Sequence, residues 1–200
     1  MGAKGRGYLD PRYCVVSDGG QGKYVIGSTI TDKNDPNDVN DPKYKSTGSM
    51  RNLLLLQADV KHECYANMVI LHKLLKLETF PHPITYSGDL KLLTAQLGLS
   101  GASGLHGCPF CTGKRIGEKG KKKRWIVGEQ RTFGRLLEKH RQFIHPNGGK
   151  GNKLNAGKYE NVINMPIRLS HGNDDRPLIH EIAPGPLHCM LLGRYSILFV

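Results

Sequence analysis

The sequence predicts an α/β fold in which helices pack against one mixed β-sheet. Short apolar runs typical of strands come first, segments with helical periodicity follow, and a fourth strand-like run separates two of these segments. Such an alternation of strand and helix signals is typical of an α/β domain. For a chain of 200 residues, size scaling predicts burial of about 70% of the accessible surface, enough for a core without disulfides.

The first three strands are predicted to form an antiparallel meander. Residues 13–18 and 23–30 are apolar runs separated by a glycine-rich turn, and the short gap favours a hairpin. Residues 31–48 are rich in Asp, Asn and Pro and lack periodicity, which indicates a loop. Residues 49–59 contain four consecutive leucines and continue the meander as a third strand.

A helical crossover is predicted to lead to the fourth strand. Apolar residues recur at helical spacing over 63–77, residues 84–89 read as a strand, and 90–99 as a second helix. Connections between parallel strands are almost always right-handed. We therefore expect the fourth strand to lie parallel to the first strand and beside it.

The pattern is weaker in the second half of the chain. It predicts a helix over 133–143, a strand over 177–182 and a helix from Pro186 onward. Because that last apolar stretch runs straight to the final residue, we expect the chain to be a fragment. There is no run of 18 apolar residues, so we expect no membrane span and no membrane partner.

Positive charge is concentrated in one segment. The net charge is +12, and residues 101–160 hold 14 Lys and Arg against four acids, so +10 lies there. This asymmetry points to a polyanion, most commonly nucleic acid. The alternative is a solvated lysine-rich loop or a nuclear import signal at 121–124. The candidate nucleic-acid-binding residues are Lys114, Arg115, Lys121, Lys122, Lys123, Arg124 and Arg131.

Two aspartates end the first and fourth predicted strands. If these strands are parallel neighbours, Asp18 and Asp89 share the carboxyl edge of the sheet, where α/β folds bind ligands. Paired carboxylates suit Mg²⁺, which keeps positions open for water and phosphate and supports phosphodiester displacement. Glu63, which opens the first helix, offers a third carboxylate. The alternative is that both aspartates only form turns and that Glu63 only complements the helix dipole.

A Cys-x-x-Cys pair forms half of a zinc signature. Cys108 and Cys111 need two more ligands for a closed tetrahedral site, and His140 and His145 follow at a spacing that allows chelation. Two other interpretations remain open: zinc ligands beyond the end of this chain, or a redox pair. A redox pair would normally follow a strand in a thioredoxin-like unit, which this sequence lacks.

Several segments together resemble one family. Residues 85–111 resemble the family that includes the catalytic subunit of the V(D)J recombinase and the Transib-like transposases. In this family the second catalytic aspartate precedes a short helix, a turn of small residues and a Cys-x-x-Cys element. Residues 17–22 and 58–63 are similar to its other acidic segments, and 183–189 is a weaker match.

The resemblance implies a ribonuclease H-like fold and the active site of a DDE-type transposase or recombinase. Asp18 and Asp89 would bind Mg²⁺ or Mn²⁺, Glu63 would assist, and the cysteine pair would be half of a zinc site. The family's third catalytic acid is a Glu on a late helix, beyond the end of this chain. Glu181 precedes the 183–189 match, so it does not occupy that position.

We therefore expect a nuclear, transposase-derived core that cuts DNA and transfers strands, incomplete in this chain. We expect it to act as a homo-oligomer or with an accessory subunit. The alternatives are a non-catalytic nucleic-acid-binding descendant and a zinc-stabilised interaction protein. We expect four parts: an N-terminal tail at 1–12, a partial catalytic core at 13–104, a Cys-x-x-Cys and basic insertion at 105–160, and the truncated start of a helical insertion domain at 161–200.

Overall fold

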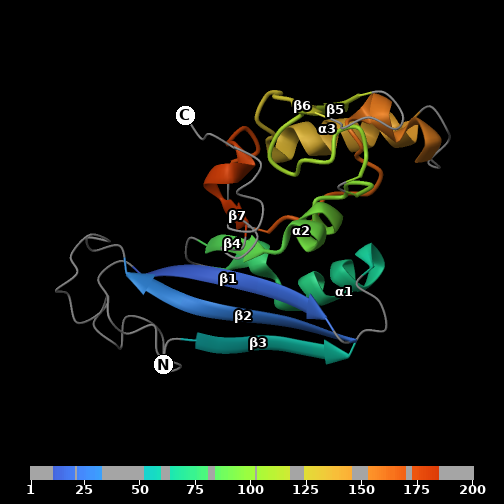
Figure 1. The fold of residues 1–200 in the computed structure, drawn as a ribbon. Helices are drawn as coiled ribbons and strands as arrows, with labels where there is room; N and C mark the ends of the chain where they lie inside the picture. The colour runs from blue at the N-terminus through green and yellow to red at the C-terminus, as the bar shows by residue number, and fades with distance from the viewer. Residues whose placement is uncertain are drawn as a thin grey trace.

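The computed structural model has a five-stranded mixed sheet, helices beside it, and a smaller helix-and-ribbon layer beyond them (Figure 1). The predicted mixed α/β fold is confirmed. The residues that the structure describes are 11–20, 22–32, 52–59, 64–80, 84–101, 103–117, 124–145, 153–169 and 173–184. The predicted loop over 31–48 and the predicted helix from Pro186 lie largely or wholly outside them.

The first three strands form the predicted antiparallel meander. β1 (Pro11–Gly20) pairs with β2 (Lys23–Asp32) as a hairpin, and β2 pairs with β3 (Asn52–Asp59). Burial alternates along β1: Val15 is buried whereas Val16 is exposed. One face of the sheet therefore packs on the core, which is the arrangement that alternating residues in antiparallel strands specify.

The fourth strand lies where the handedness rule places it. Helix α1 (Tyr65–Leu75) and the 3₁₀ turn η3 (Leu77–Thr79) form the crossover to β4 (Ile84–Gly88), which runs parallel to β1. β7 (Ile182–Pro184) is parallel to β4 on its other side. The order across the sheet is therefore β3-β2-β1-β4-β7.

The segment before β7 differs from the prediction of a strand over 177–182. The 3₁₀ turn η6 (Leu178–His180) occupies most of it, and the strand begins only at Ile182. The Leu178 amide donates to the carbonyl oxygen of Arg131 (2.8 Å), and Pro177 bridges to Thr132. These contacts tie the segment to the start of α3, so it turns before it reaches the sheet.

The other predicted helices form with slightly different ends. α2 (Leu90–Gln96) follows β4 directly, and α3 (Phe133–Ile144) lies in the smaller layer. The side chain of Thr132 accepts a hydrogen bond from the Arg135 amide and caps α3, a common way for a helix to begin. The periodicity of apolar residues thus located all three helices to within two or three residues at either end.

The smaller layer contains elements that the sequence did not predict. β5 (Lys114–Ile116) and β6 (Arg124–Ile126) form a two-stranded ribbon, and η5 (Lys153–Tyr159) packs near α3. Strands of three residues are too short to show an alternation of apolar and polar residues. Figure 1 shows the ribbon and α3 together, on the opposite side of α2 from the large sheet.

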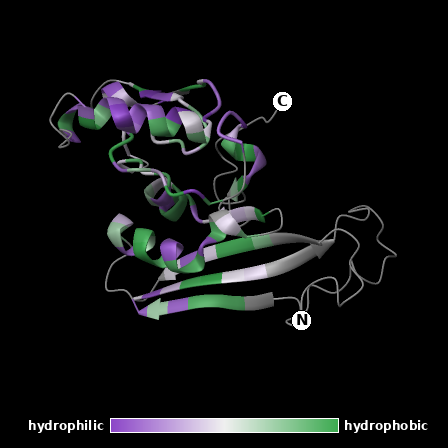
Figure 2. Cartoon of the chain, turned by 180° about the vertical axis from the view of Figure 1, so that it is seen from behind, coloured by the Kyte–Doolittle hydropathy of each residue, from purple (hydrophilic) through white to green (hydrophobic). Residues whose placement is uncertain are grey.

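The main core joins the sheet to the helices. Ile26, Tyr86, Met68 and Leu93 are buried and come from β2, β4, α1 and α2. In Figure 2 the large strands are hydrophobic along much of their length, whereas hydrophobic and hydrophilic residues alternate along α3. This is the pattern expected of core strands and of a helix that has one face in solvent.

A polar cluster lies inside this core. The Gln96 side-chain amide donates to the hydroxyl oxygens of Tyr24 and Tyr86, at 2.8 Å each. His72 Nε2 lies 3.1 Å from the Tyr24 hydroxyl oxygen, and His72 is only 3% exposed. Burial lowers the pKa of His72 to about 4. The cluster therefore joins β2, β4, α1 and α2 through a neutral imidazole.

This burial predicts a pH dependence of stability. An unfolded histidine titrates near 6.5, so folding favours the neutral form of His72, whose pKa in the folded chain is about 4. This contribution, about 3 kcal/mol, is complete above pH 6.5 and is lost as the pH falls from 6.5 toward 4. Urea unfolding of His72→Gln across this range should show a shallower loss of stability than the wild type.

The matched control for this measurement is His180→Gln. His180 is exposed in η6, and solvent reaches its ring in the folded and the unfolded chain alike. This variant should keep the wild-type pH dependence. A His72→Gln curve parallel to that of the wild type would show that the imidazole of His72 does not cause the acid sensitivity.

Candidate functional site

Asp18 lies two residues before the end of β1, and Asp89 directly follows β4, at the same edge of the sheet. β1 and β4 are parallel, and Ser17 pairs with Gly88 in their register. Asp18 and Asp89 are the next residues of the two segments. Because adjacent strands lie about 4.8 Å apart, the two residues emerge side by side. The predicted parallel placement of β4 beside β1 is confirmed, and it puts Asp18 and Asp89 at one carboxyl edge.

Local hydrogen bonds orient both carboxylates. Asp18 is exposed, and its Oδ1 accepts a hydrogen bond from the Gly19 amide (2.9 Å). Asp89 is half-buried at the N-cap of α2, and its Oδ1 accepts from the Leu92 amide (2.5 Å). No hydrogen bond to the second oxygen of either group involves another described residue. Among the described residues, each aspartate thus has one anchored oxygen and a second oxygen without a hydrogen bond.

Gly88 allows the two strands to approach at this edge. A Cβ atom at this position would lie 3.0 Å from Ser17 Oγ and 3.4 Å from the Ser17 carbonyl oxygen. A larger residue would therefore have to displace the Ser17 side chain by a few tenths of an ångström. The glycine before the second aspartate thus fits the close packing here and leaves space beside the carboxylates.

The described residues place neither of the other two acids singled out in the sequence, Glu63 and Glu181, at this edge. Glu63 lies outside the described residues. Glu181 precedes β7, and because Ile182 pairs with Tyr86, it lies level with Thr85, about 13 Å along the strands from Asp89. Ligands of Mg²⁺ lie about 2.1 Å from the ion, so Glu181 cannot share an ion with Asp89.

Two carboxylates are a donor set that fits Mg²⁺. This ion is commonly held by one or two carboxylates and completes its octahedron with water and phosphate oxygens. Within the described part of the chain, no group of three or more His, Cys, Asp or Glu side chains could hold a metal ion. The edge therefore offers two carboxylates, while the remaining positions of an octahedral ion would be left for water or substrate.

The Cys-x-x-Cys turn is the second candidate metal site. The Cys108 thiol donates a hydrogen bond to the Cys111 sulfur. This hydrogen bond, together with those from the amides of Gly113 and Gly128, lowers the pKa of Cys111. The same interaction, together with burial, raises the pKa of Cys108. Gly113 and Gly128 are packed so closely that a Cβ on Gly128 would lie 2.5 Å from Gly113 N. The backbone is thus arranged to stabilise a thiolate.

The two predicted histidine ligands lie on α3. His140 is half-buried, and burial lowers its pKa, whereas His145 is exposed at the C-terminal end of the helix. Neither joins the cysteines in a group of three ligands among the residues that the structure describes. The turn thus offers two cysteine side chains, and zinc binding with His140 and His145 as further ligands stays a prediction.

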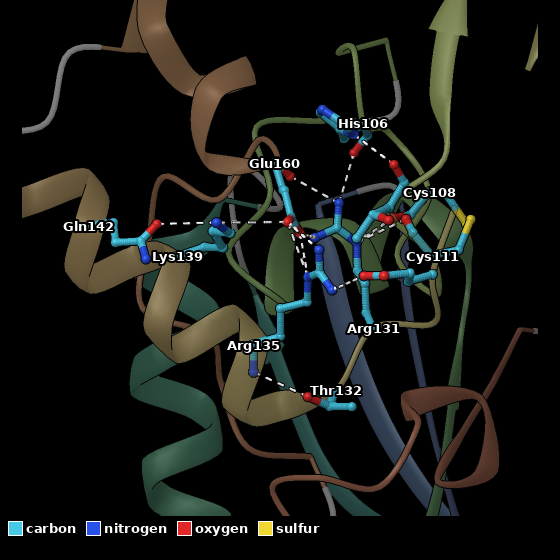
Figure 3. Close-up of polar contacts among 11 residues, drawn as sticks. His106, Cys108, Cys111, Arg131, Thr132, Arg135, Lys139, Gln142 and Glu160 are labelled. Atoms are coloured by element: carbon cyan, nitrogen blue, oxygen red, sulfur yellow. Dashed lines mark hydrogen bonds and ion pairs between the residues drawn. The ribbon is translucent and has the colours of Figure 1, made fainter. Parts of the chain in front are cut away.

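Arg131 has a different role from the predicted contact with nucleic acid. It is 0% exposed, so its guanidinium group cannot reach a phosphate backbone. Its Nε donates to the carbonyl oxygens of Cys108 (3.1 Å) and Cys111 (3.0 Å). Nη2 donates to the carbonyl oxygens of His106 (3.3 Å) and Glu160 (2.9 Å). Arg131 therefore holds the cysteine turn in place (Figure 3).

Glu160 balances the buried charge of Arg131. Its carboxylate accepts from Arg131 Nη1 (3.2 Å) and Arg135 Nη2 (2.7 Å), and Lys139 Nζ lies 3.9 Å away (Figure 3). Burial alone would raise the pKa of Glu160, but the two guanidinium groups outweigh it and lower that pKa. This network links the cysteine turn to α3. Sequence composition grouped Arg131 with the exposed cations because only the fold reveals its burial.

Three of the remaining predicted cations lie on the ribbon. Lys114 on β5 and Arg124 on β6 are exposed, and Arg115 on β5 is half-buried. Lys121, Lys122 and Lys123 lie outside the described residues. The ribbon thus carries three of the seven predicted nucleic-acid-binding residues.

Comparisons with known proteins add no assignment. No family model, curated protein or solved structure matches this chain. No helix among the described residues is long and apolar enough to cross a membrane.

The Arg131 network predicts a large loss of stability when its cation is removed. Arg131→Met would leave four carbonyl oxygens without their donor and Glu160 without one of its two close cations. Breaking a buried ion pair by removing one partner costs about 3–5 kcal/mol. Urea unfolding should show a loss of this size.

Arg141→Met provides the matched control. Arg141 lies on α3 with its side chain 71% exposed and pairs only with Glu138 among the residues described. Its replacement should change stability by less than about 0.5 kcal/mol. Equal effects of the two substitutions would contradict the structural role of Arg131.

Proposed function

We propose that this chain is the ribonuclease H-like core of a DDE-type transposase or recombinase, which cuts DNA and transfers strands. Asp18 and Asp89 would hold the Mg²⁺ or Mn²⁺ that this chemistry requires. One observation carries the proposal: Ser17 pairs with Gly88 in parallel strands, so the two carboxylates follow at the same edge.

The order of the strands supports this proposal. Three antiparallel strands, a crossover helix and a parallel fourth strand beside the first strand are the arrangement that the family resemblance implies. The fifth strand, β7, extends the sheet on the far side of β4. The edge formed by β1 and β4 is thus the place where the family would carry its first two acids.

The chemistry follows from the two carboxylates and their surroundings. The exposed Asp18 and the half-buried Asp89 provide negative charge that attracts a divalent cation, and the cap contact of Asp89 restricts its side chain. A bound Mg²⁺ would stabilise the charge on the oxygens of the reacting phosphodiester. Gly19 and Gly88 have no side chains to block a nucleic-acid backbone.

The charge of the insertion supports DNA as the substrate. Most of the net charge of +12 comes from residues 101–160, and Lys114 and Arg124 are exposed there. Cations in such a cluster attract phosphate groups without regard to base sequence. A nuclear location and assembly with a second copy or an accessory subunit belong to the same proposal, as family properties.

Replacement of either aspartate tests the proposed active site. Asp18→Asn and Asp89→Asn remove one negative charge each, and asparagine at position 89 can still cap α2. Each variant should lose Mg²⁺-dependent nicking of duplex DNA by at least about 100-fold while DNA affinity stays within about twofold. Mn²⁺ titration followed by electron paramagnetic resonance should show weaker metal binding.

Asp175→Asn is the matched control, because Asp175 is an exposed aspartate in the segment before η6 and does not belong to the β1–β4 edge. It should keep wild-type nicking and Mn²⁺ binding. Nicking retained by both Asp18→Asn and Asp89→Asn would reject the active site. Wild-type DNA binding with neither Mg²⁺-dependent nicking nor Mn²⁺ binding would instead favour the non-catalytic nucleic-acid-binding module, because the partial core would still bind the metal.

We also propose that Cys108 and Cys111 bind zinc. The amides of Gly113 and Gly128 stabilise a thiolate there, and thiolates are common ligands of zinc. Co²⁺ substituted for zinc should give thiolate-to-metal charge-transfer absorption that the Cys108→Ser, Cys111→Ser double variant lacks. Cys64→Ser, which replaces an exposed cysteine outside the turn, should keep the absorption. The same absorption in all three proteins would exclude the turn as the site.

A further inference from the structure

We propose that the β5–β6 ribbon enters the major groove of duplex DNA with the face that carries Lys114, Ile116, Arg124 and Ile126. This inference rests on the proposed function, because it names the form of nucleic acid that the core would hold. It goes further in assigning the contact to one face of one element. It also separates cation contacts with phosphates from aliphatic contacts with base edges.

The register of the ribbon defines this face. Lys114 pairs with Ile126, and Ile116 pairs with Arg124. Side chains of directly paired residues lie on the same side of a sheet, and the side alternates along each strand. All four residues therefore share one face, which we call the groove face. Arg115, between Lys114 and Ile116, belongs to the other face.

The groove face combines accessible cations with accessible aliphatic groups. Lys114 and Arg124 are exposed, Ile126 is 50% exposed, and Ile116 is half-buried. Neither Lys114 nor Arg124 forms an ion pair or a hydrogen bond with another part of the described chain through its side chain. The two cations lie at diagonal corners, each opposite an isoleucine.

This combination matches a DNA major groove. The groove is about 12 Å wide and admits a two-stranded β-ribbon, and thymine methyl groups there accept apolar contacts. Cations at diagonal corners can reach the phosphates on both sides of the groove. The major groove of A-form RNA is too narrow for side chains to read. Duplex DNA therefore fits this face better than duplex RNA does.

The ribbon is anchored firmly at its base. The Thr112 amide donates to the Glu129 carbonyl oxygen, and the Arg131 amide donates to the Phe110 carbonyl oxygen, at 2.8 Å each. Cys111 and Gln130 form a bridge between these two contacts. These contacts continue the pairing of β5 with β6, and the buried Arg131 side chain fixes their far end by hydrogen bonds to the cysteine turn (Figure 3). A rigid base reduces the ordering cost of binding.

The first test compares two pairs of cations that carry the same charge. Lys114→Ala with Arg124→Ala alters the groove face, whereas Lys153→Ala with Lys158→Ala removes two exposed lysines of η5. Affinity for a 20-base-pair DNA duplex is measured by fluorescence anisotropy from 50 to 200 mM NaCl without divalent metal. Two lost phosphate contacts should reduce the slope of log K against log salt by about 1.8.

The η5 pair should keep the wild-type slope within error. Equal slopes for the two double variants would show that DNA responds only to total charge, and this would overturn the inference. Circular dichroism and thermal melting of both variants should match the wild type, because all four side chains are exposed. If a double variant melts at a different temperature from the wild type, the DNA-binding measurement is repeated with the single variants Lys114→Gln and Arg124→Gln.

The second test concerns the aliphatic contact. Ile126→Ser should weaken binding to duplex DNA by about 5- to 20-fold and leave the salt slope unchanged, because it removes an apolar contact and no charge. Val127→Ser is the control, since Val127 is 89% exposed but follows the paired part of the ribbon. Equal losses in the two variants, or an equal preference of the wild type for duplex RNA, would contradict groove entry.

These outcomes can be told apart from failure of the proposed function. If Asp18→Asn abolishes nicking and the ribbon variants bind DNA like the wild type, the active site stands and the groove face is wrong. If the ribbon variants lose DNA binding and Asp18→Asn still nicks DNA, the groove face stands and the proposed active site is wrong. Each result therefore decides one claim.

Discussion

The parallel pairing of β4 with β1 is the constraint on which the candidate active site depends. Side chains alternate between the two faces of a strand, so a register shift of one residue moves every side chain to the other face. In the observed register Val15 and Ser17 are buried while Asp18 is exposed. The alternative would bury the Asp18 carboxylate without a partner, which costs several kcal/mol. The apolar pattern of β1 therefore also fixes where its acid lies.

The buried polar cluster connects this edge to the interior of the fold. Asp89 caps the first turn of α2, and Gln96 at the other end of that helix donates to Tyr24 and Tyr86. The helix is thus held by a carboxylate at one end and by a buried amide at the other. Because Tyr86 lies on β4, three residues before Asp89, the same contacts orient both the strand and the helix on either side of the acid.

The parts of the fold that the sequence predicted are those set by local pattern. The hairpin, the third strand, α1 to α3 and the position of β4 follow from apolar spacing and from the handedness of crossovers. The ribbon and β7 have three residues per strand, and their pairing is decided by contacts distant in sequence, so no local pattern predicts them. Asp18 and Asp89 could be chosen because both end predicted strands. Arg131 could not be separated from neighbouring cations, since its burial depends on Glu160 and on the carbonyl oxygens of the cysteine turn.

The placement of Lys114 and Arg124 away from Asp18 and Asp89 has a physical basis. A lysine or arginine close to Asp18 would pair with its carboxylate and reduce the attraction of that carboxylate for a divalent cation. In the structure the exposed cations Lys114 and Arg124 lie on the ribbon, on the opposite side of α2 from the large sheet. At physiological ionic strength the field of an exposed charge falls off over about 8 Å. In the proposed complex with DNA, cations on a separate layer would therefore hold a phosphate backbone without neutralising the two acids.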